Sequence, residues 1–171
     1  MPLKRIRAAV LYTDPVREVL HQYKYSGYYA LATPLADLMV AAWARWQFPV
    51  DVVVPVPLHH AREHQRGFNQ AALLVSSIGD RLNWNSDDEA LWRTRPTRPQ
   101  LGLNGAERRA NVAGAFQGVP ERLVDRRVLL IDDVFTTGAT LAAAADAALA
   151  AGARTVSAYC LATVSTGREF N

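Results

Sequence analysis

The chain of 171 residues is half hydrophobic and one-fifth charged, which is the composition of a single soluble globular domain with a substantial core. Its net charge of +3 is too small by itself to indicate nucleic-acid binding. No apolar run approaches the ~20 residues needed to cross a bilayer, so we expect no membrane insertion. No apolar segment follows the basic N-terminus, so we expect no signal peptide, and the single cysteine, Cys160, fits a reducing cytoplasm.

The first fifty residues predict one strand and two helices. Residues 6–12 have strand character. Asp14-Pro15 is a favourable helix start, because aspartate can cap a helix and proline fits its first turn. Apolar residues at helical spacing predict a helix over 15–25. A second, largely apolar helix is expected over about residues 32–46, with its aromatic residues in the core.

Residues 51–57 (Asp-Val-Val-Val-Pro-Val-Pro) predict a second strand, buried on both faces. A polar loop over 58–69 and a helix over about 70–82 are expected to follow. Successive strand–helix units of a parallel sheet repeat the same direction, so this loop should open at the same edge of the sheet as later ones. Arg62 and Arg66 are then candidates for binding an anionic group; the alternative is that they are solvated loop charges.

Residues 60–64 read His-Ala-Arg-Glu-His, which matches a zinc-peptidase pattern. That motif requires a helix that places both histidines on one face. Here the pattern follows the end of a Pro-x-Pro strand and is expected in a loop, with no further set of metal ligands. We therefore interpret it as a chance match.

A short strand is expected over 87–92, followed by an unusual segment over 93–109. This segment holds five arginines, one glutamate, two prolines and two glycines, without usable periodicity. It predicts a loop longer than most connections, which indicates either a lid or a binding loop. Strand character returns over 111–117.

Residues 128–141 read Val-Leu-Leu-Ile-Asp-Asp-Val-Phe-Thr-Thr-Gly-Ala-Thr-Leu. The apolar run predicts a buried strand that Asp132 and Asp133 close, and the alanine-rich sequence predicts a helix over about 137–151 that Gly152 ends. A further strand is expected over 155–164. This order places both acids beside a helix start at the carboxyl edge of the sheet, where open α/β sheets bind ligands.

The residue types at this edge suit a ribose 5-phosphate. The first N–H groups of a helix lack intrahelical partners and can bind a phosphate, while carboxylates accept hydrogen bonds from vicinal hydroxyls or bind a hydrated Mg²⁺. The alternative is that Asp132 and Asp133 only end a strand and cap a helix. It is the weaker interpretation, because two buried carboxylates are costly without a partner.

This run resembles the signature of type I phosphoribosyltransferases, which bind 5-phosphoribosyl 1-diphosphate (PRPP). The resemblance implies an α/β fold with an open, mostly parallel twisted sheet, Rossmann-like in its core, with flanking helices and a small N-terminal hood. It implies that Asp132 and Asp133 hold the ribose hydroxyls and, indirectly, Mg²⁺. The 5-phosphate would lie on Thr136, Thr137, Gly138, Ala139 and Thr140, and the diphosphate on the loop with Arg62, Arg66 and Gly67. In 6-oxopurine enzymes the position of Thr136 is usually an aspartate general base, which counts against a hypoxanthine or guanine substrate.

Further motifs narrow the resemblance to the ComF family of competence-associated proteins. They are Lys24-Tyr25-x-Gly27, Pro55-Val56-Pro57-Leu58 with Arg62, Arg66-Gly67-Phe68-Asn69-Gln70, Arg93-x-Arg95 with Gln100 and Leu103, and Arg109-x-Asn111-Val112 with Ala115-Phe116. Many members carry an N-terminal zinc ribbon of four cysteines, which is not in this sequence and implies a shorter natural member or a truncated one. We expect one domain over 1–171, with a hood over 1–50 and a PRPP-binding core over 51–171 that contains a flexible loop over 93–111.

The resemblance implies two competing functions. In the first, a phosphoribosyltransferase, the lid arginines Arg93, Arg95 and Arg98 meet the diphosphate and contribute to catalysis, and a nitrogenous acceptor of unknown identity binds under the hood. Lys24 and Tyr25 could face that site. The alternative is that Lys24 is an ordinary surface lysine and Tyr25 an ordinary core tyrosine. In the second, a non-catalytic protein of DNA uptake binds single-stranded DNA through the same arginines. Relatives of this fold are often dimers, so a homodimer is also possible.

Overall fold

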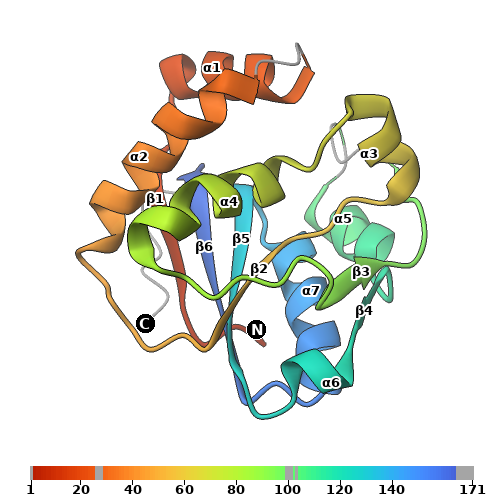
Figure 1. Cartoon of the computed structure of the whole chain (residues 1–171). Coiled ribbons are helices and arrows are strands. Elements are labelled where there is room, and N and C mark those ends of the chain that lie inside the picture. Colours follow the sequence, from red (N-terminus) through yellow and green to blue (C-terminus); the bar gives the residue numbers. More distant parts are fainter. Residues whose placement is uncertain (1, 26–28, 99–101, 103, 165–171) are drawn as a thin grey trace.

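A parallel sheet of four strands forms the centre of the computed structural model, which describes residues 2–25, 29–98, 102 and 104–164 (Figure 1). The strands lie in the order β1 (Ile6–Leu11), β6 (Thr155–Thr163), β5 (Arg127–Phe135) and β2 (Val52–Pro55). All three pairings are parallel. The sheet confirms the expected α/β class. The two inner strands and β2 are largely apolar, and side chains on both of their faces are buried.

Side chains of β5 alternate between two hydrophobic layers. Leu129 and Ile131 pack in the layer with α1 (Asp14–Tyr25), α2 (Ala32–Trp43) and α4 (Gln70–Leu82). Val128 and Leu130 pack in the opposite layer with α7 (Ala139–Ala150). Smaller elements border the second layer: the antiparallel strands β3 (Leu91–Arg93) and β4 (Phe116–Gly118), and the helices α5 (Gly105–Val112) and α6 (Pro120–Leu123).

The N-terminal segment divides between the sheet and its carboxyl edge. Strand β1 pairs with β6 and so belongs to the main sheet, and α2 packs beside α4. Helix α1, followed by the short η1 (Tyr29–Leu31), lies at the top of Figure 1, beyond the carboxyl ends of β5 and β6. Within residues 1–50, α1 is therefore the helix that lies over this edge of the sheet.

Two helices lie where the sequence predicted loops. Helix α3 (His60–Arg66) begins because a ring nitrogen of His59 accepts a hydrogen bond from the backbone N–H of Ala61 at 3.3 Å, and it ends at Gly67, whose φ is 84°. The helix corrects the reason for setting aside the zinc pattern, because His60 and His64 do lie one turn apart on a helix. In the described part of the chain, however, no group of three or more His, Cys, Asp or Glu side chains could hold a metal ion.

Helix α5 lies inside the segment that the sequence predicted as an irregular loop. Its start is a reciprocal cap: the side chain of Asn104 accepts from the backbone N–H groups of Ala106 and Glu107, both at 3.0 Å, and Glu107 accepts from the N–H of Asn104 at 2.7 Å. Because the helix runs on to Val112, the strand expected over 111–117 begins only at Phe116.

Candidate functional site

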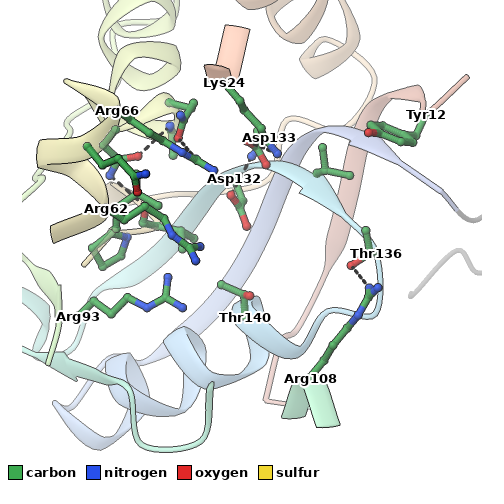
Figure 2. Close-up of a pocket in the computed structure, with 18 residues that line it drawn as sticks. Tyr12, Lys24, Arg62, Arg66, Arg93, Arg108, Asp132, Asp133, Thr136 and Thr140 are labelled. Carbon is green, nitrogen blue, oxygen red and sulfur yellow. Dashed lines mark hydrogen bonds and ion pairs between the residues drawn. The ribbon is translucent and has the colours of Figure 1, made fainter. Parts of the chain in front are cut away.

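A cavity of about 810 Å³ opens at the carboxyl ends of β5 and β2 (Figure 2). Its wall carries two carboxylates and five cationic side chains: Asp132, Asp133, Lys24, Arg62, Arg66, Arg93 and Arg108. Cationic side chains therefore outnumber carboxylates in the described lining. A cavity of this charge suits a polyanionic ligand that also offers groups for the carboxylates to bind.

The two adjacent acids are not equivalent. They lie within β5, which continues to Phe135, and they do not close the strand as the sequence suggested. Asp133 is nearly buried and its Oδ2 lies 2.8 Å from Nζ of Lys24, whereas Oδ1 of Asp132 accepts a hydrogen bond from the backbone N–H of Asp133 at 2.9 Å. Burial, and then the neighbouring charge of Asp133, raise the pKa of Asp132 to about 7.

Lys24 belongs to the site, which settles one of the alternatives that the sequence left open. Its side chain comes from the last turn of α1 and lies among the cavity residues. Burial by itself lowers the pKa of Lys24, but the carboxylate of Asp133 outweighs that effect and leaves it raised. The ion pair therefore joins α1 to the carboxyl edge of the sheet. The side chain of Tyr25 lies outside the described part of the structure, as do Gly27, Gln100 and Leu103 of the family motifs.

A short turn that contains Gly138 joins β5 to α7, as expected, but the helix begins at Ala139, two residues later than predicted. Gly138 is the N-cap with φ 75°, and a Cβ there would lie 2.7 Å from Cε2 of Phe135. No described side chain caps this helix, so its first N–H groups are available to a ligand. The side chains of Thr136 and Thr140 line the cavity; Thr137, Gly138 and Ala139 complete the turn but are not among the lining residues.

Three arginines gather at the other end of the cavity. Nη1 of Arg66 donates to Oε1 of Gln70 at 3.0 Å, and Nη2 of Arg62 donates to the carbonyl of Thr97 at 3.4 Å. Arg93 donates to Oγ1 of Thr97 at 2.6 Å, while its Nε is buried without a hydrogen-bond partner. Burial, followed by the charge of Arg62, lowers the pKa of Arg93 to about 10. An anion placed between these guanidinium groups would relieve their mutual repulsion.

The other two arginines expected at this end do not line the cavity. Nη2 of Arg95 donates to the carbonyl of Ala113 at 2.7 Å. The backbone of Arg98 exchanges two hydrogen bonds with the side chain of Asn111, at 3.0 and 2.9 Å. Both residues therefore hold the segment that precedes α5 against the C-terminal end of that helix. Gly67 also lies outside the lining; it ends α3.

Sequence reasoning missed Arg108 as a site residue. It lies on α5, and its Nη1 donates to Oγ1 of Thr136 at 3.1 Å (Figure 2). The Asn104-x-x-Glu107 capping box could have predicted the helix, but the contact of Arg108 with Thr136 depends on how that helix packs in the fold.

Comparison with known proteins identifies the family. The chain is 36% identical over 166 residues to the DNA utilization protein YhgH of Escherichia coli O157:H7, and the match covers 94% of this chain and 72% of that protein. The chain belongs to the ComF family. It is also 32% identical over 138 residues to competence protein F of Haemophilus influenzae, covering 76% of this chain and 60% of the relative. ComFC of Bacillus subtilis is 29% identical over 171 residues, with 93% of this chain and 64% of that protein covered. None of the protein-family models compared with the sequence matches it.

Solved structures confirm the fold of this ComF protein as that of type I phosphoribosyltransferases. The allosteric regulatory enzyme of purine biosynthesis matches with a TM-score of 0.51 at 18% identity, covering 94% of this chain and 31% of that one. The glutamine PRPP amidotransferase of B. subtilis, complexed with ADP and GMP, matches with a TM-score of 0.51 at 16% identity, covering 94% and 32%. Among the described residues, no helix is both long enough and apolar enough to span a membrane.

Proposed function

We propose that this ComF-family protein binds PRPP together with Mg²⁺ and transfers its phosphoribosyl group to a nitrogenous acceptor, releasing diphosphate. The observation that carries the proposal is the order of groups in one cavity. Arg62, Arg66 and Arg93 lie at one end, Asp132 lies near the middle, and Thr136, in the turn that leads to α7, lies at the far end (Figure 2). A diphosphate, a ribose diol and a 5-phosphate follow one another in PRPP in the same order.

The residues present fit Mg²⁺. This ion binds oxygen ligands and is usually held by one or two carboxylates together with phosphates of the substrate. Asp132 is the carboxylate that fits this role, because Asp133 is already paired with Lys24. When bound, Mg²⁺ would neutralise charge that develops on the diphosphate.

The side chains of the cavity supply the remaining chemistry. Arg62, Arg66 and Arg93 stabilise the leaving diphosphate, because charge-assisted hydrogen bonds strengthen as its negative charge grows. The C1–O bond breaks with its electron pair on the diphosphate, and a lone pair of the acceptor nitrogen forms the new C1–N bond. The proton that this nitrogen loses passes to the released diphosphate. Asp132 orients the ribose by accepting from its hydroxyls.

Release of diphosphate from PRPP over a panel of nitrogenous acceptors tests the proposal. We expect turnover with at least one acceptor, and a loss of about 10²-fold or more in rate for Arg62→Met or Arg93→Met. Arg17→Met is the matched control, because Arg17 forms an exposed ion pair with Asp14 outside the cavity. No turnover, together with no binding of PRPP, would refute the proposal.

A second candidate function is binding of single-stranded DNA. The relatives are named as DNA utilization and competence proteins, and Arg98 and Trp92 are exposed outside the cavity lining, with Trp92 51% exposed. Arginine can bind phosphates and an exposed tryptophan can stack on bases. Salt-dependent binding that falls in an Arg98→Met, Trp92→Ala variant and is unaffected by PRPP would support this function on a surface separate from the cavity. Complete competition by PRPP would instead place the DNA in the cavity.

A further inference from the structure

Helix α5 is held in a defined position at the rim of the cavity. Its N-terminus is closed by the reciprocal cap of Asn104 and Glu107, and its body packs against α7. The segment that leads to it is tied back by the pairing of Arg98 with Asn111. A side chain on α5 is therefore presented to the cavity by a fixed helix, as binding sites require.

Arg108 is the side chain that α5 presents. It lines the cavity and donates to the hydroxyl of Thr136 at 3.1 Å, two residues before the N-cap of α7. Figure 2 shows Arg108 at the Thr136 end, whereas Arg62, Arg66 and Arg93 lie across the cavity. Cationic side chains thus occupy both ends, and they come from different elements of the fold.

Arg108 and the start of α7 both contribute positive charge to the Thr136 end of the cavity. The N-terminus of a helix is the positive end of its dipole, and no described side chain caps it here. A guanidinium group nearby adds a second positive charge. A dianion bound between them would interact favourably with both, which points to a phosphate monoester as the ligand of this end.

We propose that Arg108 binds the 5-phosphate of PRPP, so that α5 is part of the phosphate site and the two ends of the cavity recognise their anions with different arginines. This inference rests on the proposed function. On binding, the Arg108 guanidinium exchanges the Thr136 hydroxyl for phosphate oxygens, and the hydroxyl donates to the same phosphate. Arg108 is then a specificity residue for a phosphorylated sugar, and Arg62 is its counterpart for diphosphate.

Calorimetric titration with PRPP, ribose 5-phosphate and diphosphate, each with Mg²⁺, separates the two ends. We expect Arg108→Met to weaken PRPP and ribose 5-phosphate by about tenfold or more and to leave diphosphate within about twofold of the wild type. Arg62→Met should instead weaken PRPP and diphosphate and leave the affinity for ribose 5-phosphate nearly unchanged. Arg108→Lys should recover part of the affinity, because the charge is kept but the planar pair of donors is lost.

Arg109→Met is the matched control. Arg109 is the next residue of α5, is exposed and does not line the cavity, so the same change of charge should leave all three affinities unaltered. If Arg108→Met binds PRPP as the wild type does, if it loses diphosphate equally, or if Arg109→Met matches it, the inference is wrong. If the wild type itself fails to bind PRPP, the proposed function fails first. Thermal unfolding of each variant checks that the fold is intact.

Discussion

Nζ of Lys24, at the end of α1, lies 2.8 Å from Oδ2 of Asp133 on β5. The two side chains are 23% and 12% exposed, so the pair is largely removed from water. It makes the adjacent acids of the signature unequal, because Asp133 anchors a helix and Asp132 remains the carboxylate for the ligand. It also ties residues 14–25 to the edge of the sheet where the ligand is expected.

Breaking this pair from one side should destabilise the protein. Lys24→Met leaves a nearly buried carboxylate without its cation, and we expect a loss of about 2–4 kcal/mol in the free energy of unfolding. The double variant Lys24→Met, Asp133→Asn should recover much of the loss, because no uncompensated charge remains. Urea unfolding measures both. Arg81→Met, which breaks the more exposed pair of Arg81 with Asp37, should change stability little. Equal stability of Lys24→Met and the wild type would show that the pair does not anchor α1.

The raised pKa of Asp132 should make stability depend on pH. Burial raises this pKa from 3.8 to about 7, so the folded state holds a proton that the unfolded state has lost. The free energy of unfolding should therefore fall as pH rises from about 4 to about 7, and the lost contribution should not return above that range. Asp132→Asn stays neutral throughout, so it should gain about 2 kcal/mol on the wild type between pH 5 and pH 8. Urea unfolding across this range gives the difference, and a constant difference would contradict the assignment.

Gly138 should tolerate no side chain. Gly138→Ala places a Cβ at a φ of 75° and 2.7 Å from the ring of buried Phe135. We expect a loss of at least 1–2 kcal/mol in stability and weaker binding of PRPP, because the turn that opens α7 must shift. Gly79→Ala is the matched control: its new Cβ meets no atom within 4 Å inside α4, so it should stabilise slightly. Equal thermal unfolding of the two variants would argue against a rigid turn.

The cap of α5 should affect ligand binding at a distance. Asn104→Ala removes the acceptor for two helix N–H groups and should cost about 1 kcal/mol of local stability. Amide hydrogen exchange in α5 should accelerate, and PRPP affinity should fall in the direction of Arg108→Met but by less. Faster exchange in α5 with unchanged affinity would mean that the ligand does not need Arg108 held in place.

Most of the sheet could be predicted from the sequence, because its strands are largely apolar, although β5 continues past the two acids that were expected to end it. The helix expected over about 70–82 matches α4, and the structure shows that Asn69 caps its start by accepting from the backbone N–H of Ala71. The segment 93–113 was predicted less well. Its prolines, glycines and charges conceal a helix whose start depends on a local cap and whose position depends on packing against α7.

The sequence predicted the kinds of group at the site better than the full set of residues that line the cavity. The acids of β5 and the threonines after it follow from a local run, and the structure places Asp132, Asp133, Thr136 and Thr140 in the cavity wall. Lys24 and Arg108 reach that wall from distant parts of the chain, and no local pattern predicts which long side chain will cross the gap. The same reason explains why Arg95 was expected in the cavity, although it bonds to the backbone of Ala113.

Isothermal titration of the wild type with PRPP, with and without Mg²⁺, measures whether the cavity binds PRPP through Asp132 and the metal ion. We expect saturable binding of one PRPP per chain that depends on Mg²⁺ and weakens by about tenfold or more in Asp132→Asn. Absence of binding under all conditions, or equal affinity in the wild type and Asp132→Asn, would contradict it.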